Sequence, residues 1–425
     1  MKVLVVGGGG REHTLCLAIS QSEHLTSLYC APGNGGIQQV AECVPIDAED
    51  LDGIMNFAAQ ADIDLVVVGP ERPLIMGLAD RLRDEGILVY GPSKRAAQLE
   101  GSKAFTDELL AKYGLSSKRF RVFDTPEAAR EYIDGQDVPI VVKADGDAFG
   151  KGVMVCEDRE QAKDFVDTIM IERAFGDAGD RVVIEECLVG EEATIQVFTD
   201  GETIRPMVPS QDHKRIGEGD KGLNTGGMGC YSPVPSVTDR IMQTVVDRII
   251  QPTVDAMASE GNPYNGTLYG GCMLTQNGPE VLEYNCRFGD PEAQVVIPRL
   301  QSDLLEILTA TAEGDLKSVR PEWSEQAAAC VVIASGGYPV EYEKGKKITG
   351  IEDAEADELV RVYHAGTRLE DGVYYTDGGR VLGVTALGDD YDDAFDRAYA
   401  AVEKIHFEDM YFRSDIGWRA RSDKR

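Results

Sequence analysis

Two oxygen-bearing side chains, Glu283 and Asn285, stand two positions apart in residues 280–285, which we expect to form a strand. Side chains alternate along a strand, so both lie on one face, and Arg287 continues that face. Mg²⁺ is commonly held by one or two protein oxygens together with phosphate oxygens and water, so the pair predicts a divalent metal site. Arg287 can form two parallel hydrogen bonds to a carboxylate or a phosphate. The alternative is a solvated strand face with an incidental Glu–Arg pair.

A glycine-rich loop follows a second basic position. Lys143 ends an expected strand over 140–144, and the loop 145–152 contains three glycines and Lys151. Such a loop can form a flap that covers a polyphosphate, because glycines let the backbone approach closely. It is not the phosphate loop of nucleotide hydrolases, since Gly152 stands where Ser or Thr would hold a metal. The alternative is a glycine-rich hairpin with solvated lysines.

Residues 184–192 have the groups that bind a nucleoside. A strand expected over 181–186 leads into a short hinge and a further strand. Glu185 and the backbone amides of Cys187 and Leu188 suit an adenine edge, and Glu192 suits ribose hydroxyls. Without the other motifs, a charged surface turn would be the better interpretation.

The N-terminal turn, residues 7–10, contains four glycines and is followed by Arg11. Glycines at the start of a helix let backbone N–H groups approach an anion. A dinucleotide fingerprint would need a glycine where Glu12 stands and an acidic residue after the second strand, where 31–34 offers none. The turn therefore favours a compact phosphate over NAD, and the alternative is a plain tight turn.

A polar loop over 211–229 is long enough to be functional rather than a simple connection. His213 within it has the chemistry of a general base, but a structural or substrate-orienting role is the favoured interpretation. The five histidines of the chain show no metal-site spacing.

The elements that must position these residues alternate over the first hundred positions. Strands are expected at 2–6, 28–31, 63–68 and 88–90, and helices at 11–21, 51–60 and 73–85. The run 63–68 is continuously apolar, as expected for a strand buried on both faces. The pattern predicts a doubly wound parallel sheet with its loops at the carboxyl ends of the strands.

Two further domains are expected after residue 100. Residues 93–113 favour helix with a break at Gly101. The expected later elements are strands at 140–144, 153–156, 181–186 and 327–334 and helices at 159–171 and 237–258. The sequence thus predicts a multidomain α/β protein. Its domains are placed at 1–100, 101–325 with a subdomain at about 120–186, and 326–425 as a small α+β domain.

The charge balance disfavours some classes of protein. The 425 residues include 42 Lys and Arg against 74 Asp and Glu, a formal net charge of −32, whereas nucleic-acid binders need a basic face. No apolar run is long enough to cross a membrane. The nine cysteines are scattered without a C-x-x-C pair, which argues against disulfides and structural zinc. We expect a soluble, cytoplasmic monomer or weak oligomer that binds neither nucleic acid nor membrane.

In their order along the chain, these motifs resemble the ATP-grasp superfamily. Over essentially its whole length the sequence is similar to the phosphoribosylamine–glycine ligase family of that superfamily. The likeness rests on several long strings, which are GGREH at 9–13, APGN at 31–34, VGPE at 68–71, QLEGSKAF at 98–105, VVKADG at 141–146, GKGV at 150–153, AFGDAG at 174–179, SQDHKR at 210–215, NTGGMG at 224–229, EYNCRFGDPE at 283–292, HAGT at 364–367 and DIGWRA at 415–420.

The resemblance implies a central ATP-grasp fold with a mobile flap subdomain, and a role for each motif. The residues that would hold ATP are Lys103, Lys143, Asp145, Gly146, Gly150, Lys151, Gly152, Glu185, Cys187, Leu188 and Glu192. Those that would line the phosphoribosylamine site are Gly9, Gly10, Arg11, Asn34 and Glu71. Asp212, Lys214, Arg287 and Asp290 would surround the glycine carboxylate and the acyl phosphate, and Glu283 and Asn285 would bind Mg²⁺ or Mn²⁺.

The resemblance also implies a reaction. ATP would phosphorylate glycine to glycyl phosphate, and 5-phosphoribosylamine would then displace phosphate to give glycinamide ribonucleotide. The alternatives are another ATP-grasp ligase or carboxylase, which 210–215 and 283–292 disfavour, and a non-catalytic nucleotide-binding regulator, which the intact metal and lysine positions disfavour. One departure concerns the flap, where Asp147 and Phe149 replace the small apolar residues usual in the family.

Overall fold

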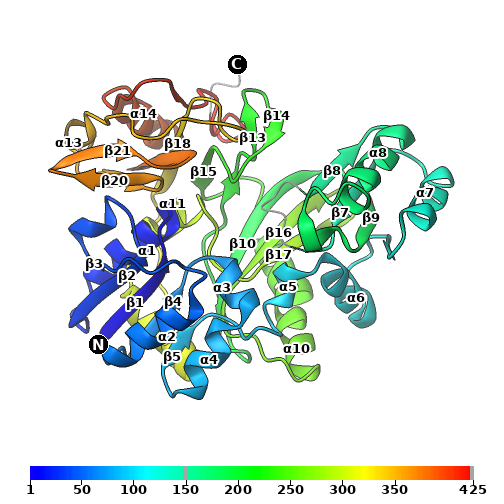
Figure 1. The fold of residues 1–425 in the computed structure, drawn as a ribbon, viewed down its shortest axis with the longest axis horizontal. Coiled ribbons are helices and arrows are strands. Elements are labelled where there is room, and N and C mark those ends of the chain that lie inside the picture. The colour runs from blue at the N-terminus through cyan, green and yellow to red at the C-terminus, as the bar shows by residue number, and fades with distance from the viewer. Residues whose placement is uncertain (147–151, 422–425) are drawn as a thin grey trace.

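The first hundred residues form a five-stranded parallel sheet. The computed structural model describes residues 1–146 and 152–421 of the chain. The strands of the first sheet are β1 (Lys2–Gly7), β2 (Ser27–Pro32), β3 (Glu42–Cys43), β4 (Leu65–Val68) and β5 (Leu88–Tyr90). They are parallel in the order β3-β2-β1-β4-β5. The predicted doubly wound sheet is therefore confirmed (Figure 1).

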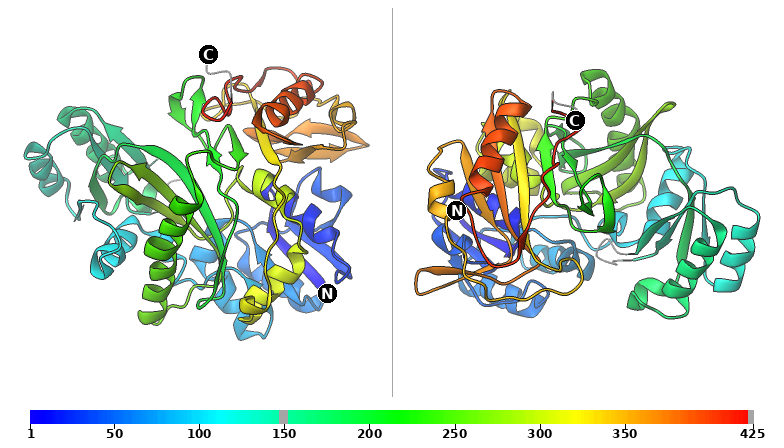
Figure 2. Two further views of the ribbon diagram at one scale, coloured as in Figure 1. Left: turned by 180° about the vertical axis from the view of Figure 1, so that it is seen from behind. Right: turned by 90° about the horizontal axis from the view of Figure 1, so that it is seen from above.

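Both faces of this sheet are buried, because successive side chains alternate between them. Leu4 and Val6 of β1 belong to one apolar cluster, and Val3 and Val5 to another. The first face is covered by α2 (Leu51–Gln60), α3 (Glu71–Met76) and α4 (Leu78–Asp84). The second is covered by α1 (Gly10–Ser20) and by α12 (Leu304–Glu313), which comes from more than 200 residues later. In the view from behind, the yellow chain that includes α12 lies across the blue sheet (Figure 2, left).

One predicted helix is two helices in the structure. The sequence predicts a single helix over 73–85, but α3 and α4 are separated at Gly77, whose φ of +99° lies in the left-handed region. A side chain at that position would be strained, so glycine is what allows the chain to turn between the helices.

The flap subdomain is a four-stranded antiparallel sheet with two helices (Figure 1). Its strands are β6 (Phe120–Phe123), β7 (Ile140–Ala144), β8 (Val153–Cys156) and β9 (Val182–Glu186), in the order β6-β9-β7-β8. The helices α7 (Pro126–Asp134) and α8 (Arg159–Met170) pack on it through their own apolar cluster. The helices α5 (Gln98–Gly101) and α6 (Lys103–Tyr113) precede it, with the predicted break between them.

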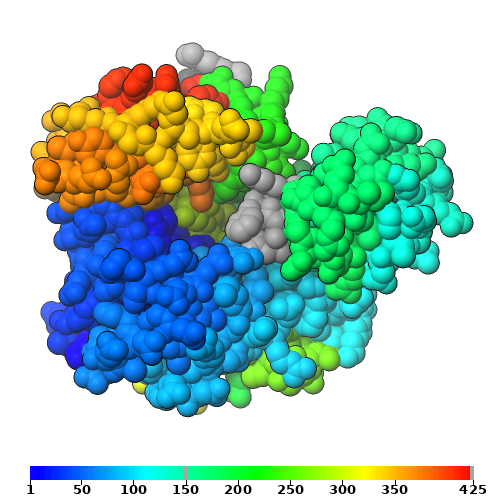
Figure 3. All heavy atoms as spheres, in the orientation of Figure 1, coloured from blue at the N-terminus to red at the C-terminus, as the bar shows by residue number. Residues whose placement is uncertain are grey.

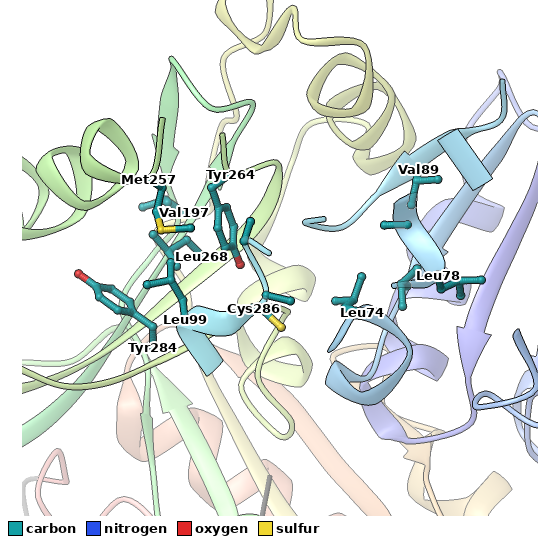
Figure 4. Packing of buried hydrophobic residues seen from close by; sticks show 14 of the residues in the cluster. Leu74, Leu78, Val89, Leu99, Val197, Met257, Tyr264, Leu268, Tyr284 and Cys286 are labelled. Carbon is teal, nitrogen blue, oxygen red and sulfur yellow. The ribbon is translucent and has the colours of Figure 1, made fainter. Parts of the chain in front are cut away.

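The central sheet is also antiparallel and has the order β11-β10-β16-β17. Its strands are β10 (Glu191–Thr199), β11 (Ile204–Pro206), β16 (Gly266–Thr275) and β17 (Gly278–Asn285). The helix predicted over 237–258 begins as α9 (Asp239–Val245), passes through a π-helical turn at Val246–Ile250, and continues as α10 (Gln251–Ser259). Leu268 and Tyr284 of this sheet share one apolar cluster with Leu74 and Val89 of the first domain (Figure 4).

The last sheet combines strands from two parts of the chain. Its order is β12-β15-β18-β22-β19, with β23 (Met410–Tyr411) paired to β18. Its members are β12 (Gln211–Asp212), β15 (Gly229–Ser232), β18 (Ala327–Ser335), β19 (Val360–His364) and β22 (Arg380–Gly388). The polar loop 211–229 thus leaves the central sheet to join this one. The domain bounds at 1–100, 101–325 and 326–425 stay a prediction.

Further elements include the hairpins β13 (Arg215–Gly217) with β14 (Lys221–Asn224) and β20 (Thr367–Glu370) with β21 (Val373–Thr376), and the short helices α11 (Ala293–Val296) and α13 (Ile351–Ala354). The longer helix α14 (Tyr391–Val402) packs on the last sheet through the apolar cluster that it shares with β18 and β22. All nine cysteines are free, as the sequence predicts. No helix in the described part of the chain has the length and apolar character needed to span a bilayer.

Candidate functional site

A cleft of about 1100 Å³ lies between the domains of the protein. It is lined by the first domain, the flap subdomain, the central sheet and the C-terminal residues. The space-filling view shows this face hollowed between the blue N-terminal, the green flap and the orange C-terminal surfaces (Figure 3).

Most of the predicted site residues line this one cleft. They are Arg11, Glu71, Lys103, Lys143, Gly146, Gly152, Glu185, Cys187, Leu188, Glu192, Asp212, Lys214, Glu283, Asn285, Arg287 and Asp290. Four others, Gly9, Gly10, Asn34 and Asp145, are not among its lining residues. Gly150 and Lys151, together with Asp147 and Phe149, fall outside the described residues.

Glu283 and Asn285 end β17 and face the cleft, as alternation along the strand predicts. The ammonium of Lys214 lies 3.7 Å from Glu283 and 3.0 Å from Glu192. Burial would raise the pKa of Glu283, but the charges of Lys214 and the other nearby cations outweigh it and lower that pKa to about 2. Glu283 is therefore ionised at neutral pH.

These two residues fit a divalent cation that also has phosphate ligands. Glu283 offers a charged carboxylate, and the amide oxygen of Asn285 has only a long contact, 3.5 Å from the Arg287 guanidinium. Within residues 1–146 and 152–421, no three His, Cys, Asp or Glu side chains form a cluster suited to a metal. A hard cation here would take oxygens from its ligand to complete its coordination, as Mg²⁺ does.

Lys143 belongs to a buried chain of four charges. Its ammonium lies 2.8 Å from one oxygen of Glu185 and donates to the carbonyl of Leu282 at 3.1 Å. The other Glu185 oxygen accepts from Lys118 at 2.8 Å, and Lys118 also pairs with Asp107 at 2.9 Å. Burial would raise the pKa of Glu185, but the two lysines lower it to about 2.

Sequence reasoning missed Lys118 and Asp107. Neither belongs to a motif, and a single Lys after two serines, or an Asp inside a helix, is the usual composition of a solvated surface. Their burial is set by tertiary packing, because Lys118 pairs with Glu185 of β9 and Asp107 is a buried residue of α6.

Arg287 is fixed between two carboxylates. Its guanidinium donates to Glu71 at 3.1 Å and to Glu100 at 2.8 Å. Glu100, another residue missed from sequence, also accepts the backbone N–H of Cys286 at 2.7 Å. Burial would raise the pKa of Glu71, but Arg287 and Arg11 lower it to about 2. The two carboxylates hold Arg287 in one orientation at the cleft wall.

The glycines of the N-terminal turn also serve packing within the fold, and their predicted role at a phosphate stays a prediction. The N–H of Gly9 donates to Glu12 at 2.6 Å and that of Arg11 to Asp290 at 3.3 Å, so two donors of the helix N-terminus already have carboxylate partners. A Cβ on Gly10 would lie 2.5 Å from the Gln294 amide. Glycine therefore allows the 290–294 turn to approach, and Arg11 is the member of this motif that reaches the cleft.

Asn34 and Asp145 hold elements together rather than face the cleft. The Asn34 amide donates to the carbonyls of Gly8 at 2.9 Å and His364 at 2.8 Å, while its oxygen accepts two backbone N–H groups. Asp145 accepts from the Ser102 hydroxyl at 2.8 Å and from the Ala104 N–H at 3.0 Å. These bonds fix both side chains within the fold, and their predicted ligand contacts stay a prediction.

The far wall of the cleft is made by Asp290 and Arg380. Arg380 on β22 donates to the carbonyls of Gly226 at 2.6 Å and Asp290 at 2.7 Å and pairs with the Asp290 carboxylate at 3.3 Å. Opposite charges, chiefly Arg380, lower the pKa of Asp290 although its burial would raise it. The sequence did not point to Arg380, because this residue belongs to none of the motifs described above.

Asp212 and His213 differ in their surroundings. Burial, with Glu292 and other nearby carboxylates, raises the pKa of Asp212 to about 8 despite Lys214. His213 does not line the cleft. Its ring accepts the Gly417 N–H at 3.2 Å, and burial lowers its pKa to about 4. This favours the structural interpretation of His213 over the general base.

Three family models match this chain in order. They are described as the N domain of phosphoribosylglycinamide synthetase at residues 1–100, its ATP-grasp (A) domain at 101–293, and its C domain at 328–419. Among curated proteins, the phosphoribosylamine–glycine ligase of Caldanaerobacter subterraneus subsp. tengcongensis is 48% identical over 98% of this chain and 99% of the relative. That of Agrobacterium fabrum is 50% identical over 99% of both.

Solved structures agree in fold. The crystal structure of phosphoribosylamine–glycine ligase from Thermotoga maritima has a TM-score of 0.85 and 32% identity, covering 98% of this chain and 100% of that one. A biotin carboxylase complex from Campylobacter jejuni has a TM-score of 0.75 with 13% identity, covering 97% and 92%. The second likeness shows a shared fold alone.

Proposed function

Because this chain belongs to the phosphoribosylamine–glycine ligase family, we propose that it joins glycine to 5-phosphoribosylamine while ATP is cleaved to ADP and phosphate. The product is glycinamide ribonucleotide, an intermediate of purine synthesis. One observation on this chain supports the proposal. The residues proposed for the metal, the ATP phosphates and phosphoribosylamine all line one cleft, namely Glu283, Asn285, Lys103, Lys143, Arg11 and Glu71.

The chemistry is an activation followed by a transfer. The carboxylate of glycine resists nucleophiles, so it first attacks the terminal phosphorus of ATP and forms glycyl phosphate, releasing ADP. The amine of phosphoribosylamine then attacks the carbonyl carbon. The C–N bond forms as the C–O bond to phosphate breaks, and the amine loses a proton. The protein contributes position, neutralising charge and exclusion of water.

Arg287 is the group that we propose to stabilise charge on the acyl phosphate. Glu71 and Glu100 hold its guanidinium at two edges, so its orientation is set before substrate binds. Asp212, Lys214 and Asp290 complete the wall around the glycine carboxylate. Preorganised charge of this kind needs no rearrangement during the reaction.

The nucleotide is proposed to lie across the flap subdomain and the central sheet. Lys103 and Lys143 would contact its phosphates, and Gly146 and Gly152 lie at the two described edges of the flap. Glu185 and the amides of Cys187 and Leu188 would bind adenine, with Glu192 at the ribose. A divalent cation, Mg²⁺ or Mn²⁺, held by Glu283 and Asn285 would neutralise phosphate charge.

The test is ADP release measured with ATP, Mg²⁺, glycine and freshly made 5-phosphoribosylamine, each omitted in turn. We expect ADP only in the complete mixture, with glycinamide ribonucleotide formed in equal amount. ADP release with another carboxylate or amine, but not with these, would favour another ATP-grasp ligase. ATP binding with no ADP from any mixture would favour a nucleotide-binding regulator.

A further inference from the structure

A buried lysine outside the predicted motifs, Lys118, contacts the same carboxylate that holds Lys143. We propose that Lys118 is a positioning residue for ATP, which shares Glu185 and so leaves Lys143 able to turn toward the nucleotide phosphates. This inference rests on the proposed function, because it requires ATP in the cleft.

Lys118 and Lys143 both contact the carboxylate of Glu185. Each ammonium lies 2.8 Å from a different oxygen of Glu185. The side chains of Lys118 and Glu185 are 2% and 3% exposed, so water competes little for either. Lys118, Lys143 and Glu185 all line the cleft.

The buried cluster of Lys118, Lys143, Glu185 and Asp107 has no net charge only when Lys118 is present. Lys118 and Lys143 face the carboxylates of Glu185 and Asp107, two positive against two negative groups. Without Lys118, Lys143 would be the single cation beside both carboxylates. Charge-assisted hydrogen bonds are strong in a buried setting, so Glu185 would hold Lys143 more firmly and a phosphate would have to compete for it.

The backbone around Lys118 is fixed, which suits a positioning role. Lys118 lies between α6 and β6, where the chain enters the flap subdomain. The hydroxyls of Ser116 and Ser117 donate to Glu280 of β17, and the Lys118 N–H donates to Ser116 Oγ at 3.1 Å. Lys118 thus reaches Glu185 from a segment anchored to the strand that carries Glu283.

The first experiment compares Lys118→Met with Lys118→Arg and with Lys112→Met as a control. Lys112 lies on α6 and pairs with Glu260 at an exposed site. Binding of a non-hydrolysable ATP analogue is measured by calorimetry, and KM for ATP and for glycine by ADP release. We expect Lys118→Met to weaken nucleotide binding about tenfold, the loss equivalent to one charge-assisted hydrogen bond, and to leave KM for glycine unchanged. Lys118→Arg and Lys112→Met should remain close to the natural protein.

A second variant separates positioning from folding, because removing one member of a buried ion pair is strongly destabilising. Asp107→Asn with Lys118→Met removes one charge of each sign and leaves Lys143 alone with Glu185. We expect its melting temperature to recover while nucleotide affinity stays low.

Recovery of affinity together with stability would overturn the proposal, as would an unchanged affinity in Lys118→Met. If the natural protein binds the analogue but joins no glycine, the proposed function fails while the role of Lys118 is still decided by binding.

Discussion

Glu283 keeps its negative charge in surroundings that supply several cations. Its pKa is lowered to about 2 although burial opposes this, so the carboxylate is ready to bind a metal over the whole neutral range. Asn285 beside it adds an oxygen without adding charge. The pair therefore suits a cation that is also shared with phosphates, whose own charge supplies the balance.

Changing Glu283→Gln keeps the size of the side chain and removes its charge. We expect turnover to fall roughly 100-fold or more, as for loss of a preorganised charge in an active site. Titration with Mn²⁺ in the presence of an ATP analogue should show weaker metal binding. Glu306→Gln, exposed on α12, is the control. Normal turnover in Glu283→Gln would remove this residue from the metal site.

Arg11 is the one residue of the N-terminal turn that reaches the cleft, and its guanidinium also pairs with Glu12 at 2.5 Å. Arg11→Ala should raise KM for phosphoribosylamine about tenfold or more, the loss of one charge-assisted contact, with a much smaller effect on KM for ATP. Steady-state ADP release with each substrate varied measures both constants. Equal losses for the two substrates would take Arg11 out of the phosphoribosylamine site.

At the scale of elements, Asp145 joins the end of β7 to the start of α6. It accepts from Ser102, which caps α6, and from Ala104 of α6, and it pairs with Arg181 beside β9. Lys143 lies two residues before it and Lys103 lies at the first turn of α6, so this junction sets the spacing of the two phosphate lysines.

Asp145→Ala should lower the free energy of unfolding by about 1–3 kcal/mol, the cost of leaving buried donors without partners. Asp158→Ala is a matched control, since Asp158 caps α8 alone through Gln161 at 2.9 Å, and should cost about 1 kcal/mol. Urea denaturation measures both. Lost nucleotide binding with undiminished stability would instead make Asp145 a direct ligand of ATP.

Local pattern was enough for some elements and not for others. Strands β7 and β8 begin and end where apolar runs and glycines predict. Strand β12 has two residues, too few for any periodicity, so the passage of 211–229 into the last sheet could not be predicted. Arg380 was missed for a related reason: contacts across more than 90 residues bring it to the cleft, and a single charged residue carries no pattern. Glu100 lies within the motif at 98–105, but only its contact with Arg287, 187 residues away, brings it to the cleft.

At the scale of the molecule, the cleft exists because several domains contribute to it, and Arg380 ties the last domain to the cleft wall. It contacts the 226–227 backbone and the Asp290 turn, and Asp290 in turn accepts from the Arg11 N–H. The last domain thereby reaches the N-terminal turn through two side chains.

Arg380→Met should reduce kcat/KM for glycine and phosphoribosylamine about tenfold, as expected for loss of charge-assisted hydrogen bonds, and affect ATP binding less. Arg361→Met, exposed on β19 of the same sheet, is the control. A loss confined to ATP affinity would show that Arg380 does not act through Asp290.

Acid should weaken the contact between the first domain and the central sheet. Glu71 has a pKa of about 2 in the folded protein against an ordinary value of 4.5, because Arg287 and Arg11 outweigh its burial. Its contribution to stability is complete above about pH 4.5 and is lost as the pH falls toward 2. Glu71→Gln should therefore flatten the decline of melting temperature over that interval. Glu49→Gln, from an exposed pair with Arg72, should leave the decline unchanged.

The position of α12 has a consequence for synthesis of the chain. The first sheet is complete at Tyr90, yet α12, which shares the cover of one face with α1, begins only at Leu304. At about 5–20 residues per second, a ribosome needs roughly 10–40 s to make the intervening stretch. During that time the nascent sheet shows an uncovered apolar surface, which a chaperone or a premature neighbour can occupy. A gene fragment ending near residue 100 would keep that surface exposed permanently, so we expect it to aggregate when expressed alone.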